Sequence, residues 1–349
     1  MDTMRALRKV HTGADGVKLF HDFPVPEPGP GQVLIKIVYA ALCGTDLHVR
    51  HDAFPAFLPV TIGHEYSGVI AKVGEGVTEF SVGDRVISLN AAKYCGHCEY
   101  CRQGLQMLCH EKRGLGTGKD GAFADYMVYE ADRVFKMPEN LTMKAAAISE
   151  PLACVVRGVL ERATVRAGDY VYVSGPGVMG QFAAQLAKIA GAHVTVGGTG
   201  IDGERLAMAL KMGADNVVDV TAEDPVEFAK RVTNGHMFDV AFECSASPRA
   251  MDTCIDVLRK TGHLQQIALY GKMVPMDLDK MLMKEITFSN SYSAERSSWE
   301  LLLNLMATDK LHMEEFCSVV MDLEDWEKAM ELFEKKEGYK ILFQLSEEP

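Results

Sequence analysis

The chain lacks any long uninterrupted apolar segment and is short of positive charge. None of its apolar runs approaches the ~20 residues that a membrane-spanning helix requires. It has 36 lysines and arginines against 48 aspartates and glutamates, which gives a net charge of −12. Nucleic acids and anionic membranes both require a basic surface. We therefore expect neither of them as a partner.

The N-terminal sequence, MDTMRALRKV, lacks the apolar core of a secretory signal. We therefore expect a cytoplasmic protein. In a reducing compartment, nine cysteines indicate metal binding or catalysis rather than disulfide bonds. The length of 349 residues is enough for about two domains.

The segment from Val171 to Gly191, VYVSGPGVMGQFAAQLAKIAG, is the most informative part of the sequence. It begins with a short apolar run that predicts a strand, and it ends with apolar residues at helical spacing. A glycine-rich turn of the form G-x-G-x-x-G joins the two. Strand, glycine turn and helix together are the context that this motif requires for dinucleotide binding.

Each glycine of this motif has a predicted role. Gly175 allows the tight turn, Gly177 lets the backbone approach a pyrophosphate, and Gly180 lets the helix pack close to the strand. The free N–H groups at the start of the helix, at Val178 and Met179, would face the phosphates. The alternative is a glycine-rich turn that binds nothing.

The order of the remaining segments predicts an α/β fold. Strand and helix patterns alternate from His193 to Phe288, which is typical of a doubly wound parallel sheet. The first 130 or so residues instead hold short β segments separated by glycine and proline, which indicate a compact β-rich domain.

Four cysteines lie close together in the sequence, with the spacing C-x2-C-x2-C-x7-C. They are Cys95, Cys98, Cys101 and Cys109. Four thiolates can surround one tetrahedral zinc ion, and such a closed site is structural rather than catalytic. The alternatives are an iron–sulfur site, unrelated thiols, or a zinc ribbon that binds nucleic acid. The last has few basic groups to support it: His97, Arg102, His110, Lys112 and Arg113.

Three further residues with metal-binding side chains stand beside a glycine or a proline. They are Cys43, His64 and Glu150. Taken singly, each has an ordinary structural interpretation: a buried small side chain, a core histidine and a solvated helix end.

Taken together with the other motifs, these residues resemble the zinc-dependent medium-chain alcohol dehydrogenases. Five motifs occur in the order of that family: Cys43-Gly-Thr-Asp46, Gly63-His-Glu65, the four-cysteine lobe, Glu150-Pro-Leu152 and the glycine fingerprint. The resemblance covers essentially the whole chain. It is strongest to the polyol branch of sorbitol or iditol type, because Glu150 stands where ethanol-type enzymes carry a cysteine.

The resemblance implies a catalytic zinc ion held by Cys43, His64 and an acidic residue, either Glu65 or Glu150. Asp46 would orient His64. Three protein ligands leave one position open for a substrate oxygen.

The resemblance also implies hydride transfer between an alcohol and the nicotinamide, in either direction. Thr45 and His48 would carry the proton from the substrate to solvent. His48 could equally be an ordinary surface histidine.

The family fold implies two domains with the active site in the cleft between them. Residues 1–155 and 291–349 would form a GroES-like zinc catalytic domain, with a structural zinc lobe at about 93–112. Residues 156–290 would form a Rossmann NAD(P)-binding domain. Relatives are dimers or tetramers, so we expect a homodimer or a homotetramer.

One departure concerns the choice of cofactor. Chains that bind NAD usually place an acidic residue at the end of the second strand of the fold. Here Gly198 and Thr199 stand there, which favours NADP, with Arg205 as the nearest arginine. Asp202 could instead fold back to the ribose, and NAD would then fit.

The sequence therefore predicts a zinc- and NAD(P)-dependent dehydrogenase of a small polyol or secondary alcohol. A threonine-type or phosphorylated-polyol dehydrogenase is a second possibility, and a non-catalytic zinc-bearing dinucleotide-binding protein is a third. We expect a neutral polyol, because Glu65, Glu150 and the net charge of −12 disfavour anions. Hydroxyl-binding candidates follow the last predicted strand of the nucleotide domain: Ser291, Tyr292, Ser293, Glu295, Arg296 and Trp299. Arg296 alone points the other way, since an arginine can hold a sugar phosphate.

Overall fold

The structure is a computed structural model that describes residues 2–349, and the chain forms two compact units. Unit 1 holds the chain up to Pro151 together with Glu295–Asp309 and Met313–Pro349. Unit 2 holds Leu152–Ala294 and Lys310–His312. Within residues 2–349 no helix combines the length and the apolar character that a membrane span requires.

Unit 1 is built on a seven-stranded sheet whose central strand is β3 (Gln32–Ala41). The order is β10-β6-β5-β3-β18-β17, and β9 also pairs with β3. The other strands are β5 (Glu65–Val73), β6 (Arg85–Ser88), β9 (Tyr126–Glu130), β10 (Val134–Lys136), β17 (Cys317–Asp322) and β18 (Lys340–Gln344). Because β18 pairs antiparallel with β3, segments from both ends of the chain share this sheet.

Smaller elements complete unit 1. A three-stranded sheet contains β1 (Thr3–Lys9), β2 (Val17–Pro24) and β4 (Val60–Thr61), and β7 (Ala91–Lys93) pairs with β8 (Arg113–Gly114). The helices are α1 (Gly44–Arg50), α2 (Glu99–Arg102), α3 (Met143–Ala146), α10 (Arg296–Met306) and α11 (Trp326–Glu334). Helix α4 (Ser149–Val156) crosses the boundary between the units and continues as a π-helical segment, Arg157–Arg162.

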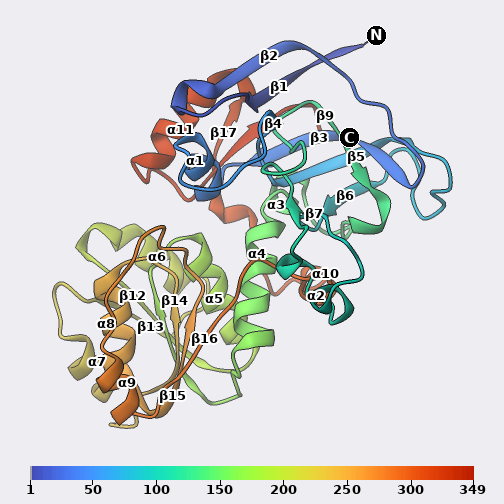
Figure 1. Ribbon diagram of the computed structural model, residues 1–349. Helices are drawn as coiled ribbons and strands as arrows, with labels where there is room; N and C mark the ends of the chain where they lie inside the picture. The colour runs from blue at the N-terminus through green and yellow to red at the C-terminus, as the bar shows by residue number, and fades with distance from the viewer. Residues whose placement is uncertain (1) are drawn as a thin grey trace. The chain divides into compact units, whose positions relative to one another are not determined.

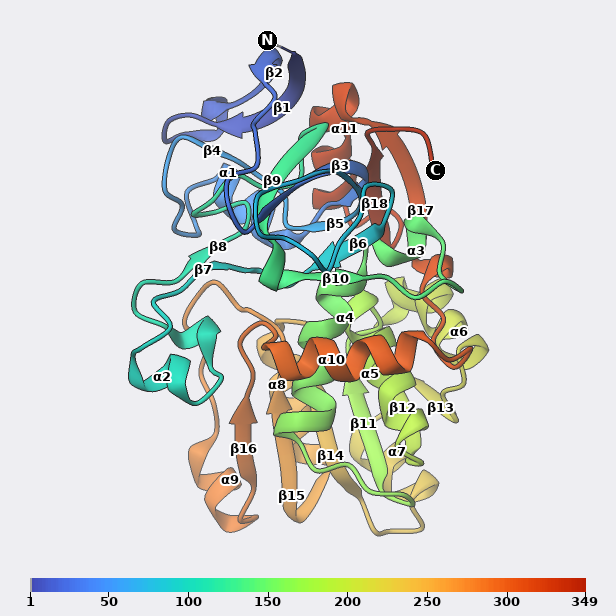
Figure 2. The ribbon, with the colours of Figure 1, turned by 90° about the vertical axis from the view of Figure 1, so that its right-hand side faces the viewer.

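Unit 2 is a six-stranded sheet in which all neighbouring strands are parallel, with the order β13-β12-β11-β14-β15-β16. Figure 2 shows β16 at one edge of this sheet and β13 at the other. The strands are β11 (Tyr170–Ser174), β12 (His193–Gly198), β13 (Asn216–Asp219), β14 (Phe238–Glu243), β15 (Leu258–Gln266) and β16 (Thr287–Asn290).

Helices cover both faces of this sheet. They are α5 (Val178–Ile189), α6 (Gly203–Lys211), α7 (Pro225–Val232), α8 (Pro248–Val257) and α9 (Leu278–Met283). Figure 1 shows α7 and α8 on one face and α5 on the other. A sheet with helices on both faces is buried on both faces, and its central strands β11 and β14 accordingly bury most of their residues.

The predicted α/β fold, with a β-rich GroES-like part and a Rossmann-like parallel sheet, is confirmed. The sequence does not predict α9 or β17. Helix α9 has six residues, and Leu278, Leu282 and Met283 on it are exposed, so it lacks the core-facing pattern that identifies a helix. Strand β17 lies at the edge of its sheet and is also short.

Two neighbouring tyrosines of unit 1 test how its core is held. Both Tyr129 and Tyr66 are buried, and the Tyr129 hydroxyl donates a 2.7 Å hydrogen bond to the Leu89 carbonyl. The Tyr66 hydroxyl has no hydrogen-bond partner among residues 2–349.

We expect Tyr129→Phe to lower the free energy of unfolding by about 1 kcal/mol, because the buried carbonyl loses its donor. Tyr66→Phe should leave it unchanged or raise it. Urea denaturation of the two variants measures the difference, and equal losses would contradict this account.

Candidate active site

Three predicted zinc ligands come together in unit 1 from two segments of the chain. Cys43 is the N-cap of α1, His64 precedes β5, and Glu65 is the first residue of β5. Their ligand atoms all lie within 4.8 Å of one another. His64 and Glu65 are buried, and Cys43 is half-buried. β3 and β5 pair directly, with Ala41 opposite Glu65, and this register brings the two segments together.

Asp46 orients both segments of this group. Its carboxylate accepts the Cys43 N–H at 3.0 Å and lies 3.5 Å from Nδ1 of His64. Burial alone would lower the pKa of His64, but the negative charges of Asp46 and Cys43 raise it well above its ordinary value. The predicted orienting role of Asp46 agrees with this placement. Nε2 of His64 is left as the ring nitrogen for a metal.

Lys340 is a residue of this site that the sequence does not predict. It lies on β18, and its buried ammonium is 2.5 Å from both carboxylate oxygens of Glu65. It also donates to the Leu42 carbonyl at 3.0 Å. Burial raises the pKa of Glu65 to about 7, although the charge of Lys340 opposes this shift. The one signal in the sequence is a lysine at the start of the apolar strand KILFQ.

The second acidic candidate, Glu150, lies outside this close group. Glu150 is in the first turn of α4, and its carboxylate accepts a hydrogen bond of 3.1 Å from the Asn90 side chain. Asn90 is the second residue that the sequence does not identify. Thr45 lies in the first turn of α1, 3.7 Å from the Cys43 sulfur to its hydroxyl. His48 follows one turn later on the same helix and is half-buried.

These donors fit a catalytic zinc ion. A thiol, an imidazole and a carboxylate are all ligands that zinc accepts, and three of them leave a fourth position for substrate. Two of the three side chains are buried, and Asp46 holds the histidine in the manner usual for metal-binding histidines.

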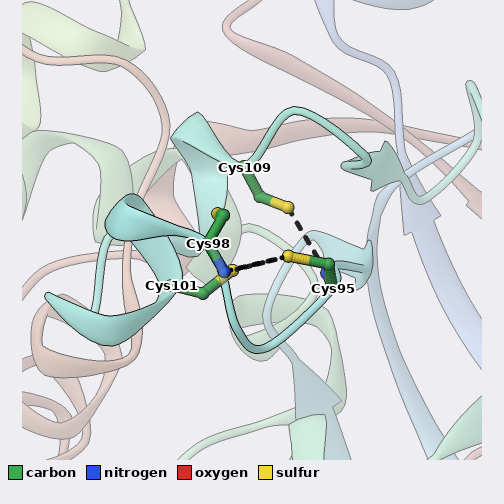
Figure 3. Close-up of side chains that lie close together, drawn as sticks. All are labelled: Cys95, Cys98, Cys101 and Cys109. Carbon is green, nitrogen blue, oxygen red and sulfur yellow. Dashed lines mark hydrogen bonds between the residues drawn. The ribbon is translucent and has the colours of Figure 1, made fainter.

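The four cysteines of the predicted lobe form a second close group (Figure 3). Their sulfur atoms all lie within 4.8 Å of one another, and those of Cys95 and Cys101 are 3.9 Å apart. Backbone N–H groups point at the sulfurs: that of Cys98 to Cys95, and that of Cys95 to Cys109, both at 3.3 Å. A backbone hydrogen bond from Cys101 lowers the pKa of the Cys98 thiol. Four converging sulfurs fit a closed tetrahedral zinc site.

The glycine fingerprint of unit 2 has the geometry that dinucleotide binding requires. Gly175 has a φ of +95°, which favours glycine. A Cβ atom on Gly180 would lie 1.8 Å from the Gly175 carbonyl oxygen, so the helix could not approach the strand with any larger residue. A Cβ on Gly177 would meet nothing within 4 Å, which leaves the backbone open to a ligand. Val178 and Met179 begin α5 directly after it.

Two other features surround this turn. Gln181 is buried, and its amide donates to the carbonyls of Pro176 and Arg205, so it connects the glycine turn with α6. The sequence does not identify Gln181. At the end of β12, Gly198 is followed by Thr199, whose N–H and hydroxyl donate to the Asp202 carboxylate at 2.9 and 2.7 Å.

The predicted hydroxyl-binding segment is divided between the units, with Ser291, Tyr292 and Ser293 in unit 2 and the rest in unit 1. Glu295 accepts the Met107 N–H of the cysteine lobe, and Trp299 is buried against Phe135. Arg296 donates to the Asp132 carbonyl and lies over the Phe135 ring. Arg296 therefore contacts a backbone oxygen and an aromatic ring of unit 1.

Comparisons with known proteins identify the family of this chain. Residues 29–139 match the alcohol dehydrogenase GroES-like domain, and residues 178–308 match the zinc-binding dehydrogenase domain. The chain is 36% identical over 340 residues to a sorbitol dehydrogenase of Halalkalibacterium halodurans, covering 97% of this chain and 98% of that protein. The chain belongs to the zinc-dependent medium-chain alcohol dehydrogenase family.

Two further relatives are informative. The dehydrogenase is 32% identical to a D-arabitol-phosphate dehydrogenase of Enterococcus avium, over 99% of both chains. Its structure is similar to that of a zinc-binding dehydrogenase from Sinorhizobium meliloti 1021 bound to NADP, with a TM-score of 0.89 and 28% identity over 99% of this chain and 100% of that one. The predicted family, its polyol branch, oxidoreductase activity and the cofactors zinc and NAD(P) are thereby confirmed.

The two glycines of the fingerprint provide a matched test. We expect Gly180→Ala to destabilise unit 2 by about 1–3 kcal/mol, because the new Cβ would overlap the Gly175 carbonyl. Gly177→Ala should leave stability unchanged and weaken NAD(P) binding, since its Cβ would point into open space. Thermal denaturation and isothermal titration of the dinucleotide measure the two effects. If both variants lost stability equally, or if Gly177→Ala bound the dinucleotide normally, this assignment would be wrong.

Proposed function

We propose that this dehydrogenase transfers hydride between a secondary hydroxyl of a polyol and NAD(P), using Cys43, His64 and Glu65 as its catalytic zinc ligands. The convergence of these three side chains carries the proposal. Glu65 is favoured over Glu150 as the direct ligand because only Glu65 belongs to the close group. Glu150, which Asn90 holds, would face the open position.

Each residue then has a defined task. When bound, zinc polarises the substrate oxygen and the nicotinamide accepts the hydride. Asp46 fixes the ring of His64, and Lys340 balances the charge of Glu65. The Thr45 hydroxyl, beside Cys43, would accept the proton of the substrate hydroxyl while it gives up its own proton toward His48, which passes a proton to solvent. A protein without catalysis would have no physical need for such an open set of ligands.

The division of labour follows the two sites. We assign catalysis to residues 1–155 and 291–349, and cofactor binding to residues 156–290 through Gly175, Gly177, Val178, Met179 and Gly180. Gly198, Thr199 and Arg205 would surround the adenosine ribose. Asp202, held by Thr199, adds a negative charge that a 2′-phosphate would have to tolerate. Initial rates with NAD and with NADP in the same assay measure the cofactor preference that these residues produce.

We also assign the protein to the cytoplasm, because its nine cysteines are all free and at least four would serve as thiolate ligands of zinc.

The two zinc sites should respond differently to substitution. Cys43→Ser is expected to abolish turnover of sorbitol and other polyols and to leave thermal stability nearly unchanged. Cys98→Ser should instead destabilise the lobe, because a structural zinc ion contributes folding free energy. Elemental analysis should find about two zinc ions per wild-type chain and one in each variant. Full activity in a protein with no zinc at the Cys43 site would contradict the proposed function.

We infer that this chain forms a homo-oligomer through the surface formed by β16 and α9. Strand β16 lies at an open edge of the unit 2 sheet, and an unpaired edge strand offers free backbone groups for pairing. Helix α9, which leads into β16, exposes apolar side chains: Leu282 is 75% and Met283 73% exposed. Apolar surface beside an open strand edge is typical of an interface between protein chains. We assign it to a second copy of this chain.

Analytical ultracentrifugation tests this assignment. The wild-type protein should sediment as a dimer or tetramer, and Leu282→Glu should shift it toward the monomer by placing a charge in the interface. Leu210→Glu is the matched control, because Leu210 is also exposed but lies on α6. A monomeric wild-type protein, or equal shifts in both variants, would rule out this surface.

A further inference from the structure

The segment from Arg113 to Gly121 packs directly against the loop that carries His64. The Gly121 N–H donates to the Thr61 carbonyl at 2.8 Å, and the Ala122 N–H donates to the Gly63 carbonyl at 3.0 Å. A Cβ on Gly116 would lie 2.6 Å from the same Gly63 oxygen. This segment therefore borders the proposed zinc site within unit 1.

Arg113, at the start of this segment, lies over an aromatic ring. Its guanidinium carbon lies 3.8 Å from the centre of the Phe57 ring. Phe57 follows α1, and its N–H donates to the Thr117 carbonyl at 2.7 Å, so its backbone is fixed to the same segment. Nη1 of Arg113 donates to the Lys112 carbonyl at 3.1 Å, and the edge formed by Nε and Nη2 can still bind an anion with two hydrogen bonds.

The charge of Arg113 is not neutralised by the protein. Its guanidinium donates to the Lys112 carbonyl, and no carboxylate of residues 2–349 forms an ion pair with it. Its cationic neighbours differ: Lys119 pairs with Glu130 at 2.7 Å, and Arg8 pairs with Asp120 at 3.1 Å. In a chain of net charge −12, an arginine that has no carboxylate partner and lies in the segment packed against the His64 loop is a candidate for binding an anionic ligand.

We propose that Arg113 binds a phosphate monoester on the substrate, so that this dehydrogenase acts on a phosphorylated polyol or the matching ketose phosphate. The inference rests on the proposed function and deepens it. Phosphate offers several oxygens to the planar guanidinium fork, which can bind two of them at once.

This assignment replaces the expectation of a neutral substrate. Glu65 and Glu150 still disfavour an anion at the metal itself, and a phosphate at Arg113 is separated from them by the carbon chain of the substrate. The acidic groups and Arg113 would then act together: they set which end of the polyol faces the metal and which end faces the arginine.

Paired substrates test the role of Arg113. The wild-type holoenzyme should use sorbitol 6-phosphate with a kcat/KM at least about tenfold above that for sorbitol, equivalent to about 1.4 kcal/mol of transition-state binding. Arg113→Gln should remove this preference, chiefly through KM, and should leave the kcat/KM for sorbitol within about threefold of wild type, a change of less than ~0.7 kcal/mol. Isothermal titration of sorbitol 6-phosphate into the zinc-loaded protein should show the same loss of affinity.

Two other variants serve as controls. Arg102→Gln removes the same charge from an exposed position on α2 and should keep the phosphate preference, which separates a local contact from net charge. Phe57→Leu removes the supporting ring and should reduce the preference by a few-fold, since cation–π contacts at exposed sites contribute about 0.5–1 kcal/mol.

Several results would overturn the assignment. These are equal use of both alcohols by the wild type, equal losses for both in Arg113→Gln, or an Arg113-dependent preference for threonine, which would place a carboxylate there instead. Failure to oxidise any alcohol would contradict the proposed function, and the titration would then still decide whether Arg113 binds phosphate.

Discussion

The buried ion pair between Glu65 and Lys340 is the contact on which the large sheet of unit 1 depends. Both groups lie in the interior, and their separation of 2.5 Å leaves each dependent on the other, because an isolated buried charge is costly. Their strands flank β3 on opposite sides, so the pair spans the central strand of the sheet. The Glu65 carboxylate is also one of the proposed zinc ligands, so the ion pair that connects β5 with β18 also holds a ligand of the metal site in place.

Much of the fold and of the site could be predicted from sequence because the informative residues form short local motifs. The fingerprint glycines are required by backbone geometry at fixed spacing, and the four cysteines lie within 15 residues of one another. Lys340, Asn90 and Gln181 could not be found in this way. Each of them forms its hydrogen bonds with a residue distant in sequence or with a backbone carbonyl, and neither kind of bond leaves a local pattern. A lysine in a strand is usually interpreted as an exposed residue at a sheet edge unless the carboxylate that it faces is known.

The arginine that would bind a phosphate is likewise not evident from the sequence alone. Composition alone makes an anionic substrate improbable for a chain of this charge, and position in a loop draws attention to Arg296. Both arginines donate to a carbonyl oxygen and lie over an aromatic ring, but of the two only Arg113 belongs to the segment that packs against the loop carrying His64. Local imbalance of charge, rather than the total, indicates what a site can bind.

The distance in sequence between Glu65 and Lys340 also has a consequence for biosynthesis. They are 275 residues apart, so at roughly 5–20 residues per second the ribosome makes the carboxylate tens of seconds before the lysine that balances it. During that interval β18 is missing from the sheet, and Glu65 has no partner that would allow it to be buried. The proposed zinc site at Glu65 is therefore completed late in synthesis, whereas the cysteine lobe, encoded within 15 consecutive residues, can bind a metal while the chain is still growing.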